Sequence, residues 1–270
     1  MGRGWCVVCC RCCRENRAGR MSSEPAVPPA TMPDMPKSKS GVPVYLEETP
    51  KRTFAVAVEW PGWARVARRP EEALEALVAY ADRYAAVPRH ARIRFRKPAS
   101  VSDLAVSQRV PGSATTEFGA PGVPLPDDGR RMDSAELARL TKLLVASWET
   151  FDEAAITAHG KRLRLGPRGG GRSLAKIIDH MREAEEGYLG ALGARPPKAV
   201  ASDPSGSMER LRSAFLATLR AVGGEPIPEP RNTKKPWSPR FAVRRSAWHA
   251  LDHAWEIEDR TGPEKPENTR

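Results

Sequence analysis

Three of the five histidines in this chain are spaced so that they could hold one metal ion. His249 and His253 are four residues apart in a strongly helical stretch, and His180 lies in the middle of a second one. Residues four apart share one face of a helix, with about 5–6 Å between their Cβ atoms, so both imidazoles can reach one divalent ion. Three neutral imidazoles leave coordination positions open for water or substrate, which is typical of reactive metal sites. Zinc, nickel and iron all accept such ligands, so the expected cofactor is Zn, Ni or Fe.

Two carboxylates next to the pair, Asp252 and Glu256, could orient the imidazoles. A carboxylate can accept the ring N–H that faces away from a metal and so fixes the tautomer of the ligand. The alternative is that the three histidines are surface or capped residues, each paired with a nearby acid. A metal site also requires the last helix to be buried on two faces, because Trp248 lies on a different edge from the histidines.

The elements that must position these residues predict an α+β chain with two modules. Residues 42–120 combine an alternating strand pattern at 52–59 with an amphipathic helix at 70–84, and residues 92–95 and 101–110 are weaker strand candidates. The composition of the next stretch, rich in Pro, Gly and Asp, predicts a linker, and four amphipathic helices follow it. The linker is expected at 121–132 and an antiparallel four-helix bundle at 133–260.

The four helices are expected to alternate in direction, so that the second and the fourth run parallel. Asp133 is expected to cap the first helix, and the other three are expected at about 173–192, 208–222 and 238–262. Two basic segments, 161–172 and 231–240, would then lie at the same end of the bundle.

Cations and helix N-termini at one end would attract an anion. The candidate binders are Arg168, Arg172 and Arg240, and the expected partner is a small anionic substrate. The alternative is that these segments are solvated loops that aid solubility.

The net charge of +11, from 44 Lys and Arg against 33 Asp and Glu, raises the question of a nucleic-acid partner. Aromatic residues interleaved with basic ones are sparse, which argues against nucleic acid. No apolar run approaches the roughly 20 residues that a membrane span needs, so we expect a soluble, cytoplasmic protein without a membrane contact. Bundle faces that carry Tyr188 and Trp255 leave room for a homodimer.

The two ends of the chain are expected to lie outside the fold. Residues 1–41 lack hydrophobic periodicity and are predicted to be a disordered leader, which contains all five cysteines. The folded part therefore has no thiol nucleophile. Later methionines, such as Met21, leave open whether residues 1–20 belong to the natural protein, and residues 261–270 are predicted to be a polar, frayed tail.

The histidine pattern resembles the DinB and YfiT-like superfamily of metal-binding four-helix bundles. His180, followed by acidic residues, is similar to the ligand that these proteins carry on their second helix, and His249 and His253 are similar to the pair on their last helix. The resemblance covers residues 133–260. It implies a metal site, and some relatives are transferases or isomerases that use a low-molecular-weight thiol such as mycothiol or bacillithiol. The chain departs from the family after His253, where Trp255 and its neighbours replace small and glutamine residues.

The first module resembles the small HicB-like fold of certain antitoxins. The resemblance is carried by the strand and turn at 53–63 and the helix start at 69–77. It implies a sheet edge that could pair with a partner protein, although the module could equally be a fixed cap on the bundle.

Two functions from different classes follow from the sequence. The first is a metal-dependent transferase or hydrolase that acts on a small anionic substrate, which could bear a thiol. The second is a non-enzymatic interaction or regulatory protein of antitoxin-like type. Bound metal distinguishes them, because only the first requires it.

Overall fold

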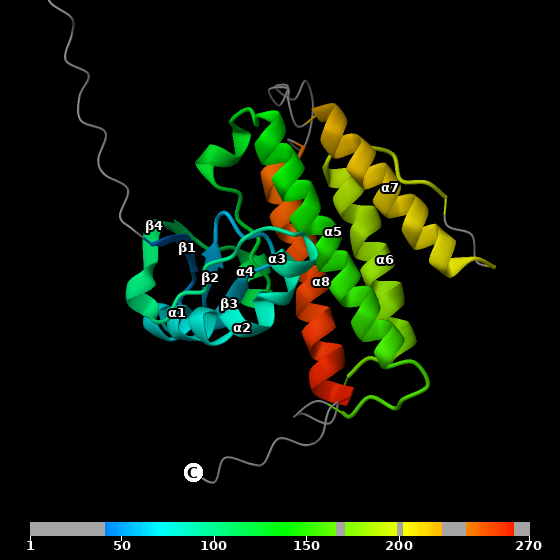
Figure 1. The fold of residues 1–270 in the computed structure, drawn as a ribbon, viewed down its shortest axis with the longest axis horizontal. Helices are drawn as coiled ribbons and strands as arrows, with labels where there is room; N and C mark the ends of the chain where they lie inside the picture. The colour runs from blue at the N-terminus through cyan, green and yellow to red at the C-terminus, as the bar shows by residue number, and fades with distance from the viewer. Residues whose placement is uncertain (1–40, 166–170, 199–201, 223–235, 262–270) are drawn as a thin grey trace, which may run out of the picture. The chain divides into compact units, whose positions relative to one another are not determined.

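A computed structural model describes residues 41–165, 171–198, 202–222 and 236–261. It confirms the α+β class: a four-stranded sheet with short helices is followed by four long helices that pack together (Figure 1). The predicted leader and tail lie almost wholly outside the described residues. Among these residues, no helix is long and apolar enough to cross a membrane.

The sheet is mixed, with the strand order β3-β2-β1-β4. Its strands are β1 (Val42–Glu48), β2 (Thr53–Ala57), β3 (Ala64–Ala67) and β4 (Leu104–Pro111). β1, β2 and β3 form antiparallel neighbours joined by short turns, whereas β4 pairs with β1 in parallel. A parallel neighbour needs a long crossover, and the three helices between β3 and β4 supply it: α1 (Pro70–Ala79), α2 (Ala81–Tyr84) and α3 (Ala86–His90).

Both faces of the sheet are buried, and alternate residues of β2 belong to different cores. Phe54 and Val56 pack in a cluster with Trp248 of the last helix. Ala55 and Ala57 point to the opposite face, into a cluster with α1. The alternation predicted for this strand is therefore confirmed, and the sheet is held between its own helices and the helical region.

Two local predictions in this module need correction. The helix predicted at 70–84 is divided at Tyr80, where α1 ends and α2 begins. The strand predicted at 92–95 is absent, and these residues are coil. Arg92 has a φ of 55°, which turns the chain out of an extended path, and the free edge of β1 is taken by β4.

A short segment connects the sheet to the long helices. It contains the short helix α4 (Ala114–Phe118) and the 3-10 helix η2 (Pro126–Gly129), whereas the 3-10 helix η1 (Val101–Asp103) lies directly before β4. η2 falls within the stretch predicted as a linker, and its Asp128 is buried against Arg244 of the last helix. This stretch is thus tied to the helices by a specific contact.

The long helices are α5 (Ser134–Thr157), α6 (Leu174–Ala191), α7 (Pro204–Val222) and α8 (Pro239–Thr261). Three of them begin within a residue of their expected starts, whereas α7 begins four residues before the expected position 208. The side chain of Asp133 accepts a hydrogen bond from the backbone N–H of Glu136, and that of Ser173 accepts one from Lys176. Each cap satisfies one of the free N–H groups at a helix start.

The prediction that the second and fourth helices run parallel is wrong. Arg260, at the end of α8, donates a hydrogen bond to the carbonyl of Arg172, just before α6. The backbone N–H of Trp237, just before α8, donates to the carbonyl of Ala191 at the end of α6. α6 and α8 are therefore antiparallel. α5 runs parallel to α8, since Glu136 binds Arg240 near the start of both helices.

The connection between α6 and α7 is long enough to permit this difference. An 18-residue α6 is about 27 Å long. The 192–203 connection can span more than this when extended, at about 3.3 Å per residue. α7 runs opposite to α5, because Trp148 meets Phe215 and Asp152 meets Arg212. α6 and α7 consequently share one direction, and α5 and α8 share the other.

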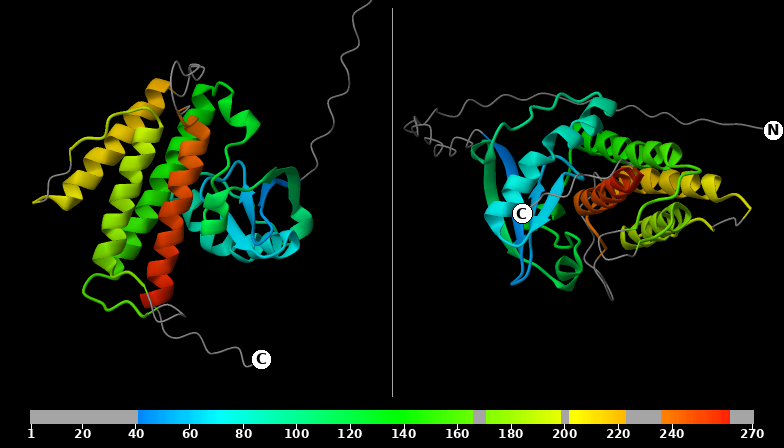
Figure 2. Two further views of the ribbon diagram at one scale, coloured as in Figure 1. Left: turned by 180° about the vertical axis from the view of Figure 1, so that it is seen from behind. Right: turned by 90° about the horizontal axis from the view of Figure 1, so that it is seen from below.

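α8 lies between the sheet and the other long helices (Figure 2). Leu251 and Trp255 pack into the core of the sheet module, whereas Ala247, Ala250 and Ala254 pack into the core of the helices. Burial on two faces is what a metal site on this helix required. The small side chains on the helical side let the neighbouring helices approach closely.

Candidate metal centre

The structure brings His180, His249 and His253 together. Nε2 of His249 lies 3.1 Å from Nε2 of His180 and 3.1 Å from Nε2 of His253. One ligand atom from each ring lies within 4.8 Å of the other two. α6 supplies one ring and α8 supplies the other two. Next to these histidines, Ile177 of α6 and Ala250 of α8 are buried in the core of the helices.

This spacing fits a single metal ion. Nitrogen ligands about 2.0–2.1 Å from a tetrahedral zinc ion stand about 3.3 Å from each other. The two Nε2 distances of 3.1 Å are close to that value. Without an ion, Nε2 of His249 has either one N–H or one lone pair, so it can make a well-directed hydrogen bond with only one of its two neighbours. A cation satisfies all three rings at once.

A chain of polar contacts fixes the orientation of His253. Its Nδ1 lies 2.7 Å from Oε2 of Glu256, and Oε1 of the same carboxylate accepts a hydrogen bond of 2.6 Å from Arg260. Arg260 in turn donates to the carbonyls of Arg164 and Arg172, before α6. With Nδ1–H directed at the carboxylate, Nε2 of His253 presents its lone pair to the other two rings.

Burial favours the neutral form of His180 and His249, which is the form that binds a metal. Burial lowers the pKa of His249 to about 2, and positive charge on His253 and His180 acts in the same direction. Burial also lowers the pKa of His180, together with the charge of Arg172. The hydrogen bond with His253 lowers the pKa of Glu256, so this carboxylate is ionised.

The two predicted outer carboxylates occupy different positions. Glu256 contacts His253 directly, as described above. Asp252 lies 3.8 Å from Arg65 of β3, which is a different partner from that of Glu256. Burial raises the pKa of Asp252, although Arg65 opposes this change. The roles of both residues in a metal-loaded site stay predictions.

The partly exposed residues of α8 lie along one line of the helix. Apart from its last turn, the helix is buried except at Arg245, Asp252 and Glu256. These residues follow one another at helical spacing, and His249 adjoins the same line. On α6, the half-buried Tyr188 faces it, with its ring centroid 5.8 Å from that of His249. The accessible side of the triad is therefore framed by Arg245 and Tyr188.

The two predicted basic segments do not meet at one end. Because α6 and α8 are antiparallel, their N-termini lie at opposite ends of the helical region. Arg168 falls outside the described residues. Arg172 is exposed just before the start of α6, and its charge acts on His180 of the triad. Anion binding by Arg168, Arg172 and Arg240 stays a prediction.

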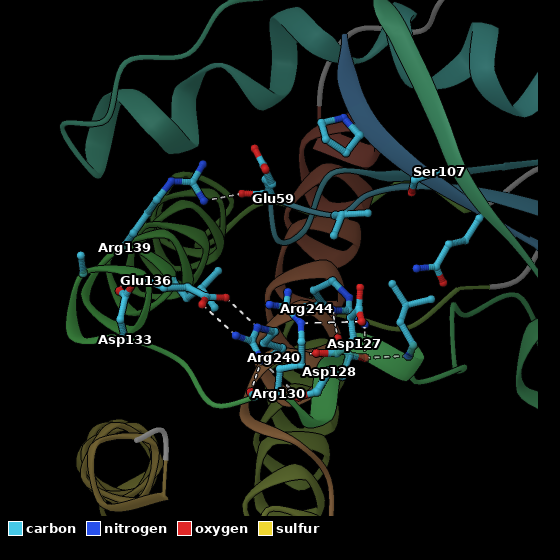
Figure 3. Close-up of a pocket in the computed structure, with 16 residues that line it drawn as sticks. Glu59, Ser107, Asp127, Asp128, Arg130, Asp133, Glu136, Arg139, Arg240 and Arg244 are labelled. Carbon is cyan, nitrogen blue, oxygen red and sulfur yellow. Dashed lines mark hydrogen bonds and ion pairs between the residues drawn. The ribbon is translucent and has the colours of Figure 1, made fainter. Parts of the chain in front are cut away.

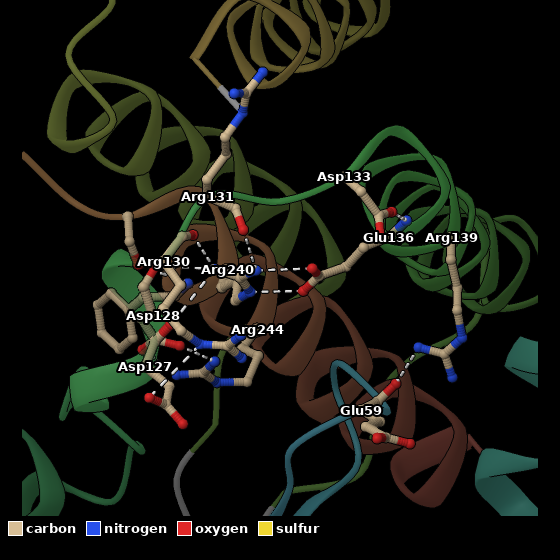
Figure 4. A network of polar contacts seen from close by, with 12 residues as sticks. Glu59, Asp127, Asp128, Arg130, Arg131, Asp133, Glu136, Arg139, Arg240 and Arg244 are labelled. Atoms are coloured by element: carbon tan, nitrogen blue, oxygen red, sulfur yellow. Dashed lines mark hydrogen bonds and ion pairs between the residues drawn. The ribbon is translucent and has the colours of Figure 1, made fainter. Parts of the chain in front are cut away.

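Arg240 is engaged at the other end by protein groups (Figure 4). Its Nε and Nη2 donate to the carboxylate of Glu136 at 2.6 and 2.7 Å, and its Nη1 donates to the carbonyl of Arg130. Only 8% of Arg240 is exposed. Its hydrogen-bonding groups therefore stabilise the junction of α5, α8 and the segment before α5.

A pocket of about 600 Å³ lies beside Arg240, between the sheet and the starts of α5 and α8 (Figure 3). Arg244 donates two hydrogen bonds of 2.6 Å to Asp128, and Arg139 donates to the carbonyl of Glu59 at 2.6 Å. Protein acceptors thus already bind these guanidinium groups. The pocket is far along α8 from the histidines, and we assign it no role in the metal site.

The sequence did not lead us to predict three residues near the triad as part of the site: Arg245, Arg260 and Tyr188. Arg245 precedes His249 by four residues, and Arg260 follows Glu256 by four. This spacing is a usable signal, because it places both arginines on the helix face of the histidines. The position of Tyr188 beside His249 depends on how α6 and α8 are aligned, which their sequences do not specify.

No protein-family model, curated protein or solved structure matches this chain.

Proposed function

We propose that this protein is a metal-dependent enzyme, a transferase or hydrolase, whose ion is held by His180, His249 and His253. The convergence of three imidazole nitrogens from two helices carries the proposal. An ion bound there would polarise a water or thiol at its open positions. Zinc, nickel and iron suit the donor set.

The surroundings of the triad support a reactive role over a purely structural one. A structural zinc site normally has four protein ligands, whereas the cluster among the described residues has three. Glu256 and Arg260 orient His253. Of the three rings, that of His180 is partly exposed, and the partly exposed Arg245, Asp252 and Glu256 lie in a line beside the triad. The arrangement agrees with the resemblance to DinB and YfiT-like proteins, which suggests a small anionic substrate and a low-molecular-weight thiol.

The sheet module supports the bundle in this proposal. Its core includes Leu143 of α5 and Leu251 and Trp255 of α8, so it braces the helix that carries two ligands. The HicB-like resemblance and a docking role for the sheet edge stay predictions.

Metal content tests the proposal first. The purified protein is analysed for Zn, Ni, Fe and Mn by mass spectrometry, beside His249→Ala and the matched control His159→Ala, which removes an exposed histidine outside the cluster. We expect one ion per chain in the wild type and the control, and none in His249→Ala. Absence of metal from the wild type after loading would overturn the proposal.

Turnover tests the enzymatic half. We would measure the turnover of candidate substrates by the metal-loaded protein, the metal-free protein and His180→Ala. The candidates are small esters, small amides, and a thiol paired with an electrophilic carboxylic acid. We expect turnover only in the loaded wild type. Turnover that persists in the metal-free protein would contradict a metal-dependent mechanism.

A further inference from the structure

Arg245 is a cation beside the triad. Among the residues that the structure describes, no carboxylate lies within 4 Å of its guanidinium, although Arg65, Arg260 and Arg240 all have one. Its Nη1 donates to the carbonyl of Pro121 at 3.0 Å, which fixes one side of the group. A side-chain hydrogen bond also joins the guanidinium to Tyr188. A guanidinium has five N–H donors, so others of its planar fork remain to bind an oxyanion.

Aromatic rings hold this guanidinium in place. Its central carbon lies 4.9 Å from the ring centroid of Trp248 and 5.8 Å from that of Tyr188. Both rings also contact His249, with centroids 6.0 and 5.8 Å away. Arg245 therefore stands one helical turn from a metal ligand, on the accessible line of α8, with its position set by packing.

An apolar surface continues from this point. The ring of Trp237 lies 5.3 Å from that of Tyr188, and both side chains are half-buried. A ligand that reaches from the triad past Arg245 would meet these two rings. Where α6 and α8 meet, the site thus offers three features in spatial order: a metal position, a cation and an aromatic surface.

We propose that Arg245 anchors the oxyanion of a small organic carboxylate or phosphate whose apolar body packs on Tyr188 and Trp237, while its reacting group meets the ion. This inference rests on the proposed function and names the substrate class of that site. It assigns the anchor to a residue distinct from Arg168, Arg172 and Arg240. Arg245 is a positioning residue, because it binds a part of the substrate that does not react.

Isothermal titration calorimetry of the cobalt(II)-loaded protein provides the test, because it measures binding of the anion without any turnover. Benzoate, phenyl phosphate, inorganic phosphate and the neutral benzyl alcohol are titrated separately. We expect benzoate and phenyl phosphate to bind at least tenfold more tightly than inorganic phosphate, and benzyl alcohol to have no measurable effect. Equal binding of benzyl alcohol and benzoate would overturn the proposal.

Arg245→Gln tests the anchor, and Arg220→Gln is its matched control. Both variants lose one positive charge, but Arg220 is an exposed residue of α7 away from the triad. We expect the first variant to weaken benzoate binding at least tenfold and the second to leave it unchanged. Unchanged binding in a cobalt-loaded Arg245→Gln would overturn the anchor. A wild type that takes up no cobalt would overturn the proposed function as well, so the two failures are distinguishable.

Labelling of the wild type gives a second measurement that needs no variant to fold. An arginine-specific dicarbonyl reagent is applied to the cobalt-loaded protein with and without benzoate, and the modified residues are located by mass spectrometry. We expect benzoate to slow modification of Arg245 and to leave that of Arg220 unchanged. Equal labelling of Arg245 in both samples would contradict the contact.

Discussion

Nδ1 of His253 lies 2.7 Å from Oε2 of Glu256, one turn along α8. This contact decides which ring nitrogen of His253 carries the hydrogen, and it leaves Nε2 free to bind an ion. The carboxylate is itself held by Arg260 at 2.6 Å. The pair therefore links the end of α8 to the geometry of the metal site.

Glu256→Gln should weaken zinc binding by about 10-fold to 100-fold, because the neutral amide orients His253 less strongly and makes the ligand less basic. Competition with a chromophoric chelator measures the affinity. Glu258→Gln is the control, since Glu258 binds Arg83 and not the triad. Equal affinity of both variants would show that Glu256 does not support the ligand.

Asp128→Asn should destabilise the protein by about 3–5 kcal/mol, because it leaves Arg244 charged and buried without its partner. Both side chains are at most 6% exposed. Asp127→Asn changes the adjacent residue, which is 64% exposed, and should alter the stability by no more than about 0.5 kcal/mol. Urea unfolding of the two variants measures the difference. Similar midpoints would contradict a buried ion pair.

Glu185 should make stability depend on pH. It is fully buried, and burial raises the pKa of its carboxyl, although Ser246 and Trp148 donate hydrogen bonds to it. An acid whose pKa is raised on folding binds more protons when folded, so the free energy of unfolding falls as pH rises above the unfolded pKa, through the window up to the folded pKa.

Glu185→Gln removes this titration and should gain stability relative to the wild type as pH rises from 5 to 8. Urea unfolding at a series of pH values measures the gap between the two proteins. A gap that stays constant or shrinks with rising pH would contradict a raised pKa for this carboxyl.

Leu143→Ala should destabilise the whole described fold by about 2–5 kcal/mol. Leu143 belongs to α5, yet it is fully buried in the core of the sheet module. Because this core is shared, we expect a single unfolding transition. Circular dichroism and tryptophan fluorescence should both report it at the same denaturant concentration. Ile156→Ala, at a position of the same helix that is 74% exposed, is the control and should change little. Two separate transitions would indicate independent modules.

Local signals allowed much of the fold and the centre of the site to be predicted. The caps at Asp133 and Ser173 mark helix starts because their side chains satisfy nearby backbone N–H groups. The spacing of His249 and His253 places both rings on one helix face whatever the tertiary structure is. Predictions of this kind depend only on residues within a turn or two of each other.

Relationships between distant segments could not be predicted in the same way. The direction of α6 relative to α8 depends on the path of the connection at 192–203, and its length permits either arrangement. Arg240 and Arg245 are both arginines that precede the histidine pair in the sequence. Their roles differ because they have different contact partners in the fold. Glu136, more than one hundred positions away in the chain, binds Arg240, and no local pattern announces that contact.

The zinc X-ray absorption spectrum of the loaded protein tests the central claim most directly, because it reports the number and type of atoms around the ion. We predict three imidazole nitrogens at about 2.0–2.1 Å, together with one or two oxygen atoms from solvent. His159→Ala should give the same spectrum, and His180→Ala should lose one imidazole. A spectrum dominated by oxygen ligands, or one that His180→Ala leaves unchanged, would contradict the site.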